Sequence, residues 1–127
     1  MFVSQPALIG KRVLIVEDEM LVALLIEELL ADLGCSTLGP CGSLGKALEA
    51  AQTGTFDLAV LDVNLGGEMV YPVAEALAER HIPFLFLSGY GDEAVPPGHA
   101  GWKVCAKPFK ADYLAEMLSA VVEAQIH

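Results

Sequence analysis

The sequence predicts an α/β fold in which helices cover both faces of a parallel β-sheet. Short apolar runs alternate with helical stretches along the chain, and four of the five runs end in a charged or hydroxyl side chain. The 127 residues can bury a core without disulfides or metals, but they leave no room for a second domain. We therefore expect one domain over residues 1–127, with its core at about 11–124 and no output domain.

The first half of the chain alternates three apolar runs with two helical stretches. The opening run, at 13–16, is unbroken, as in a strand buried on both faces. Gly34 suits the C-cap of the first helix, and Ser43 suits the N-cap of the second. We expect strands at 13–16, 36–38 and 56–62 and helices at 20–33 and 43–52.

The second half continues the alternation. Residues 64–68 are expected to form a glycine-containing loop, and Pro72 lies in the first turn of the helix that follows. Three glycines and two prolines at 91–101 allow only a short or irregular fourth helix. We expect helices at 71–80 and 111–124 and strands at 83–87 and 103–106.

Composition and charge exclude several functions. The 17 acidic and 7 basic side chains give a net charge of -10, which repels phosphate backbones, so we expect no nucleic-acid partner. Cys35, Cys41 and Cys105 form no CxxC pair and no even disulfide set, which favours the reducing cytoplasm. There is no secretory-signal pattern, and the apolar run at 20–26 is shorter than the roughly 20 residues that span a bilayer. We therefore expect no membrane insertion.

Polar side chains are predicted to meet at the carboxyl ends of the strands, where parallel sheets carry their functional sites. That edge would hold Glu17, Asp18, Asp62, Ser88 and Lys107. Each residue alone has an ordinary explanation, such as a helix cap or a surface charge. Three carboxylates together, however, repel one another unless a cation relieves them.

Magnesium suits this group because it takes oxygen ligands from carboxylates, carbonyls, water and phosphate. A backbone carbonyl near Asn64 would complete the ligand set. Lys107 adds a positive charge beside the acids. The residues together resemble a phosphoryl-transfer site, with Asp62 as the nucleophile.

The chain resembles the receiver domain of two-component response regulators. The resemblance lies in residues 13–19, 61–65, 87–89 and 106–109, in family order and spacing. It implies a flavodoxin-like (βα)5 fold: a doubly wound, five-stranded parallel sheet in a three-layer α/β/α arrangement. It also implies phosphoryl transfer from a histidine kinase or a histidine phosphotransfer protein.

The resemblance implies a role for each site residue. Asp62 would be the phosphoacceptor and a metal ligand. Glu17 and Asp18 would hold Mg²⁺ directly or through water, and Asn64 would bind it through its backbone carbonyl. Asn64 and Tyr90 would also tune the lifetime of the phosphorylated state.

The switch implied by the resemblance is only partly matched. Ser88 and Lys107 would contact the phosphoryl group and move towards it. Many receivers couple this movement to an aromatic ring three residues before the lysine, but Val104 stands there and Trp102 lies two residues earlier. Residues 86–90 are similar to a stand-alone subgroup, FAT GUY, named for a Phe-Ala-Thr-Gly motif.

Two other classes of protein share part of this pattern. A haloacid-dehalogenase-like phosphatase would also use Asp62 and Mg²⁺, but it needs an acid two residues later, where this chain has Asn64. A flavodoxin-like binding module would need a Gly-rich phosphate turn that is missing. Within the receiver family, a phosphorelay intermediate, a phosphate sink and a protein-binding switch remain open.

The first helix bears on partners because residues 20–26 are apolar on almost all sides. One face must pack on the sheet. The other is either an exposed patch for a kinase helix pair or a homodimer, or is covered by neighbouring elements.

Overall fold

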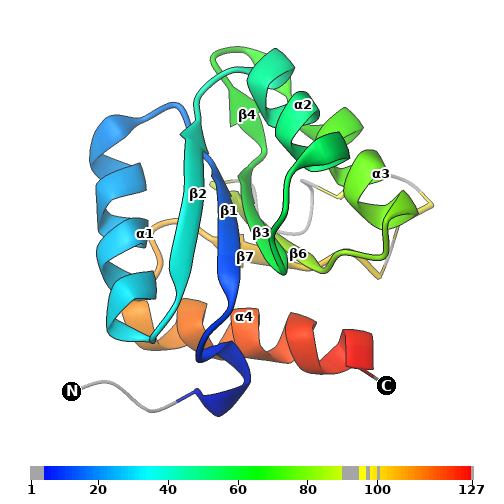
Figure 1. Cartoon of the computed structure of the whole chain (residues 1–127). Helices are drawn as coiled ribbons and strands as arrows, with labels where there is room; N and C mark the ends of the chain where they lie inside the picture. The colour runs from blue at the N-terminus through cyan, green and yellow to red at the C-terminus, as the bar shows by residue number, and fades with distance from the viewer. Residues whose placement is uncertain (1–4, 90–94, 97, 100, 127) are drawn as a thin grey trace.

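The computed structural model describes residues 5–89, 95–96, 98–99 and 101–126. Five parallel strands form one sheet in the order β2-β1-β3-β6-β7 (Figure 1). This order is that of the flavodoxin-like doubly wound fold, so the predicted fold class is confirmed. The strands are β1 (Arg12–Val16), β2 (Ser36–Cys41), β3 (Leu58–Asp62), β6 (Phe84–Ser88) and β7 (Val104–Ala106).

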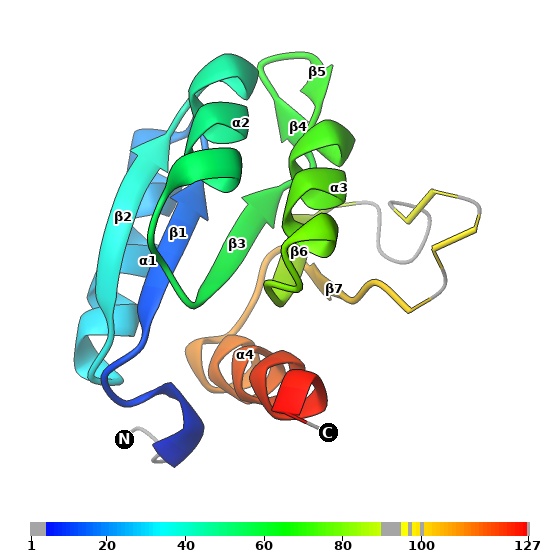
Figure 2. The ribbon, with the colours of Figure 1, turned by 45° about the vertical axis from the view of Figure 1, so that its right-hand side comes forward.

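Helices cover both faces of the sheet. Figure 2 shows α2 (Leu44–Thr53) and α3 (Tyr71–Glu79) in front of the sheet and α1 (Met20–Asp32) behind it. The last helix, α4 (Ala111–Ile126), shares a core with α1. No helix in the described part of the chain is long and apolar enough to cross a bilayer.

Alternate residues of each strand face opposite helical layers, which explains the unbroken apolar runs. On β1, Val13 and Ile15 pack in the core shared with α1 and α4, while Leu14 and Val16 pack towards α2 and α3. The pattern did not predict one contribution to the first core: Leu8, in the 3-10 helix η1 (Pro6–Leu8), is fully buried there.

Strand β2 is longer than the predicted 36–38 and irregular. Leu14 of β1 pairs with Leu38, but Val16 pairs with Cys41, so β2 contains an extra residue. Gly39 has a φ of 102°, and a Cβ there would lie 2.7 Å from the carbonyl oxygen of Ile15. Only glycine fits this close approach, which lets β2 bend at the edge of the sheet.

Two helix ends show why the helices begin and stop where they do. The Ser43 hydroxyl accepts a hydrogen bond from the Lys46 N–H at 3.3 Å, so the predicted N-cap of α2 is confirmed. After α3, the N–H of Ile82 bonds to the carbonyl of Leu77 and that of His81 to Ala78. This is a Schellman motif, and His81 occupies its left-handed position with a φ of 58°.

The predicted glycine-containing loop at 64–68 is more regular than expected, because short strands flank its two glycines and form a hairpin. Strands β4 (Asn64–Leu65) and β5 (Glu68–Met69) pair antiparallel. The turn consists of Gly66 and Gly67, both with positive φ, as a two-residue type I′ turn requires. The predicted short fourth helix falls largely outside the described residues; those of 91–101 that are described (95, 96, 98, 99 and 101) are not helical.

The outer face of α1 is exposed. Ile26, Leu29 and Leu30 point into the core. The opposite face is a row of apolar side chains that includes Leu21, which is 81% exposed. We call this row, Met20, Leu21, Leu24 and Leu25, the α1 patch. Of the two alternatives for this face, burial under neighbouring elements was therefore wrong within the described residues.

Candidate functional site

The register of the central strands brings the predicted site residues to one edge. Val16 pairs with Leu61, so the next residues, Glu17 and Asp62, emerge side by side where β1 and β3 end. In a parallel sheet these carboxyl ends share an edge. The first two polar strand ends are therefore neighbours because of backbone pairing alone.

The same argument extends across β6 and β7. Asp62 pairs with Leu87, which places Ser88 one residue beyond it, and Ser88 pairs with Ala106. Lys107 follows directly, and its N–H donates to the Ser88 carbonyl oxygen at 2.8 Å. Because β6 pairs with both β3 and β7, Ser88 at its end lies between the ends of those two strands. Ser88 is also buried.

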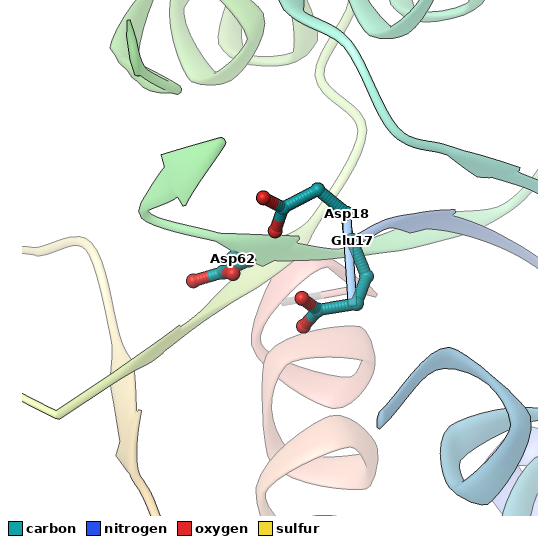
Figure 3. A group of neighbouring side chains, drawn as sticks. All are labelled: Glu17, Asp18 and Asp62. Carbon is teal, nitrogen blue, oxygen red and sulfur yellow. The ribbon is translucent and has the colours of Figure 1, made fainter. Parts of the chain in front are cut away.

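Three carboxylates gather at this edge (Figure 3). One oxygen each of Glu17, Asp18 and Asp62 lies within 4.8 Å of the other two. Glu17 is 2% exposed and Asp62 is 7% exposed, whereas Asp18 faces solvent. The group therefore has two buried members and one open side.

Glu17 is a buried carboxylate with only one of its two oxygens hydrogen-bonded in the described part of the chain. Its Oε1 accepts the Glu19 N–H at 3.1 Å, but its buried Oε2 accepts no hydrogen bond from the described residues. Burial, and secondarily the neighbouring Asp62, raise the pKa of Glu17 from its ordinary 4.5 to about 7. The Glu19 N–H and the charge of Lys107 offset this rise only in part.

Lys107 supplies the positive charge of the site. Its Nζ lies 3.4 Å from Asp62 Oδ1 and 3.6 Å from Glu17 Oε2. The lysine therefore contacts both buried acids, but one ammonium group cannot balance three carboxylates. The residual negative charge favours a further cation.

The β4–β5 hairpin holds Asn64 beside Asp62. The Asn64 N–H points to Asp62 Oδ1 at 3.4 Å, and Asn64 Oδ1 accepts the Gly67 N–H at 2.7 Å. A Cβ on Gly66 would lie 3.8 Å from Asp18 Oδ2, so the turn also approaches the exposed acid. Sequence reasoning missed this hairpin, although the Gly66-Gly67 pair was a usable turn signal.

Two further positions concern the predicted lifetime tuning, at Tyr90, and the predicted switch, at Val104. Tyr90 lies outside the described residues. Val104, which is half-buried, stands where many receivers have an aromatic residue. The Trp102 ring packs edge-to-face on Phe84 and Phe86, at centroid distances of 5.3 and 5.7 Å. The aromatic contribution near β7 thus comes from two residues earlier in the chain.

The donor set fits a hard divalent cation. It consists of oxygen atoms only, it includes the buried Glu17 Oε2, which accepts no hydrogen bond from the described residues, and its charge exceeds what Lys107 balances. Mg²⁺ binds such carboxylate groups together with water and substrate oxygens. The residues present therefore fit the predicted magnesium ion.

Comparison with known proteins identifies the class to which this fold and site belong. Residues 13–119 match the response regulator receiver domain, so the chain belongs to the receiver family of two-component systems. Domains of this class are signalling domains that accept a phosphoryl group on an aspartate, and they are not conventional enzymes. The suspected resemblance is confirmed, and nothing supports the phosphatase alternative.

Individual relatives agree with this class. The chain is 29% identical to the chemotaxis protein CheY of Pseudomonas aeruginosa over 121 residues, which is 88% of this chain and 96% of that protein. It resembles the solution structure of SdrG from Sphingomonas melonis Fr1 with a TM-score of 0.77 and 42% identity, covering 89% of this chain and 97% of that one.

A third relative shares the fold at lower identity. The receiver domain of sensor histidine kinase PA1611 from Pseudomonas aeruginosa PAO1 has a TM-score of 0.76 and 23% identity, covering 90% and 98% of the two chains. Its crystal structure has a magnesium ion coordinated in the active site cleft.

Proposed function

We propose that the chain accepts a phosphoryl group on Asp62 from a histidine kinase or a histidine phosphotransfer protein in a Mg²⁺-dependent reaction. The observation that carries this proposal is the convergence of Glu17, Asp18, Asp62 and Lys107 at the carboxyl edge of the sheet. Asp62 is the member of this group that contacts both Lys107 and the Asn64 N–H.

The proposed metal ligands are Glu17, Asp18, Asp62 and the backbone carbonyl of Asn64. The missing hydrogen bond at Glu17 Oε2 and the open side at Asp18 support this assignment, as does the magnesium ion of the PA1611 receiver. Bound Mg²⁺ would neutralise the carboxylates and the phosphoryl oxygens.

The proposed transfer uses Asp62 as the nucleophile. One of its carboxylate oxygens forms a bond to phosphorus while the phosphorus–nitrogen bond of a phosphohistidine breaks, and the bonding pair returns to the imidazole nitrogen. Lys107 and Ser88 would then contact phosphoryl oxygens. The 3.4 Å contact between Lys107 and Asp62 supports this role, since the ammonium group already faces the reacting carboxylate.

Asn64 and Tyr90 are proposed to tune how long the phosphoryl group stays. For Asn64 the support is its place beside Asp62, and for Tyr90 it is the resemblance of 86–90 to the FAT GUY subgroup. The phosphorylated chain would serve as a phosphorelay intermediate, a phosphate sink or a protein-binding switch, and these remain three separate hypotheses.

The α1 patch is the proposed docking surface for the phosphodonor. Helix α1 begins at Met20, close after the acidic pair, and its apolar outer face suits a kinase helix pair. A homodimer through the same patch is the competing hypothesis. Cross-linking the chain in the presence of a purified histidine kinase domain separates the two hypotheses. A product with the kinase that is lost in Leu21→Ser supports docking, and a product between two copies of the chain that is lost in Leu21→Ser supports the homodimer.

We also propose that the protein works in the cytoplasm. Cys35, Cys41 and Cys105 are free thiols in the structure, which agrees with a reducing compartment. Burial raises the pKa of each thiol, so the three cysteines suit core packing better than redox chemistry.

The mass of the intact protein after incubation with acetyl phosphate and Mg²⁺ tests the proposed function. We expect one added phosphoryl group in the wild type and none in Asp62→Ala or in the presence of a chelator. Asp32→Ala, which removes an exposed acid at the end of α1, is the matched control and should be modified like the wild type. Modification that persists in Asp62→Ala would contradict the assignment.

A further inference from the structure

A groove lies at the amino ends of the strands, whereas the carboxylates lie at their carboxyl ends. It has a volume of about 510 Å³ and lies between the end of α3, the start of β6 and the second half of α4. Pro83 and Lys103, which line it, directly precede β6 and β7, whereas the acidic site follows the strands. The groove is therefore separate from the proposed phosphoryl site.

The walls of the groove are apolar. Trp102, Phe84, Met117 and Val121 line it, and each is only partly buried. A volume of this size is within the range of pockets that hold small organic ligands. An apolar surface left in contact with water favours a ligand that removes it from water.

The charges around the groove are unlike those of the rest of the chain. The chain has 17 acidic side chains against 7 basic ones, yet none of the described aspartates and glutamates lines the groove. Among the residues that the structure describes, Lys103 and His81 are the charged or titratable groups of its lining. Glu123 of α4 accepts a hydrogen bond from the Ser119 hydroxyl at 3.1 Å, and neither it nor Glu79 nor Glu116 is among the lining residues.

The backbone at His81 adds an independent observation. His81 occupies the left-handed position of the Schellman motif, where glycine is the usual and least strained residue. The Ala78 and Leu77 carbonyls are already satisfied by that motif, so the end of α3 presents fewer free acceptors to repel an anion. Histidine here places an imidazole at the groove at the cost of backbone strain.

We propose that this groove binds a small amphipathic carboxylate from solution, with its apolar body against Trp102 and Met117 and its carboxylate near Lys103 and His81. A neutral apolar molecule would leave the two polar groups unused. A cation would meet Lys103 directly. This binding site does not depend on the proposed phosphoacceptor function.

Trp102 makes the test direct, because it is the only tryptophan of the chain and it lines the groove. We would titrate the 127-residue chain with decanoate below its micellar concentration and follow Trp102 fluorescence. Decanol and decyltrimethylammonium serve as neutral and cationic probes of the same length. We expect saturable binding of decanoate, several-fold weaker binding of decanol and the weakest binding of the cation, with added salt weakening decanoate only.

Variants locate the binding. Lys103→Gln should weaken decanoate binding about three- to fivefold, as expected for one exposed ion pair. Lys110→Gln, which removes an exposed lysine outside the groove, is the matched control and should have no effect. Ala120→Leu fills the groove and should also weaken binding, while Leu25→Ser in the α1 patch should not.

Three results would overturn the proposal. The first is equal affinity for the three probes, and the second is a Lys103→Gln variant that binds decanoate as Lys110→Gln does. The third is a Trp102 response to phosphatidylglycerol vesicles without any response to free decanoate, which would indicate a lipid surface instead. Unchanged circular dichroism of each variant confirms that it is folded.

Discussion

The ammonium group of Lys107 lies 3.4 Å from the carboxylate of Asp62, so a residue that follows β7 reaches the end of β3. The same group lies 3.6 Å from Glu17. A lysine in this position has two opposing effects: it stabilises the buried acids when no metal is bound, and it competes with a metal for them. Both effects are measurable.

Lys107→Ala should bind Mg²⁺ more tightly and accept phosphoryl groups more slowly. Removing the ammonium group leaves the carboxylates with uncompensated charge, which the metal then balances, and we expect a gain of about threefold or more in Mg²⁺ affinity. Calorimetry measures the affinity, and mass spectrometry with acetyl phosphate measures the rate. Lys110→Ala is the control. Weaker Mg²⁺ binding in Lys107→Ala would show that the lysine does not oppose the metal.

Mg²⁺ affinity should fall as the pH is lowered. The pKa of Glu17 is raised to about 7, so below that pH the metal must displace a proton from the carboxyl group. We expect the affinity to drop up to about tenfold for each pH unit below this value. Titrations at about pH 8 and pH 6 in two buffers of different ionisation enthalpy measure both affinity and proton release. Glu17→Gln should bind more weakly and lose the pH dependence.

The metal-free protein should become less stable as the pH rises from about 4.5 to 7. In this window the unfolded chain has lost the Glu17 proton while the folded chain still holds it, so folding takes up a proton. The contribution of Glu17 to the free energy of unfolding is fully present below the lower value and is lost by the upper one, at most about 3 kcal/mol. Urea unfolding in a chelator measures it, and an equally steep slope in Glu17→Gln would assign the effect to other groups.

Asn64→Ala should loosen the β4–β5 hairpin, whereas Asn64→Asp should not. The side-chain oxygen of Asn64 accepts the Gly67 N–H at 2.7 Å, and an aspartate keeps that acceptor. We expect alanine to lower the free energy of unfolding by about 1 kcal/mol. Chemical denaturation measures this, and the decay of the phosphorylated state tests the proposed lifetime role. A lifetime unchanged in both variants would remove that role.

Leu8→Ala should destabilise the fold by about 2–4 kcal/mol, because Leu8 is fully buried against α1 and α4. The neighbouring Ile9 is 62% exposed, so Ile9→Ala is a control of nearly the same size and position and should change stability little. Denaturant titration compares them. Equal effects would mean that the segment before β1 does not pack in solution as it does in the structure.

The sequence allowed most of the site to be predicted because the site depends on where strands end. The unbroken apolar runs predicted strands that are buried on both faces. Parallel pairing of these strands is then enough to place Glu17, Asp62 and Ser88 at the same ends of the sheet. The hydrophobic periodicity of the sequence does not show where the site side chains point or how their charges balance. The missing hydrogen bond at Glu17 Oε2 and the contacts of Lys107 with both buried acids therefore emerged only from the structure.

The features that were not predicted depend on non-local packing or on short turns. Leu8 precedes the first regular element, and nothing in its neighbours marks it as core. The hairpin at 64–69 is too short for a periodic signal, so only its turn residues could have indicated it. The exposed side of α1 was undecidable because an all-round apolar helix gives no preferred face.

The irregularity in β2 limits how this protein can assemble. A strand at the edge of a sheet can recruit another strand if it offers a regular row of N–H and C=O groups. At one edge β2 carries the bulge and Pro40, which has no N–H, and at the other edge β7 has only three residues. In the described part of the chain, neither edge is a good template for amyloid-like growth, so strand pairing between folded copies is disfavoured at both edges.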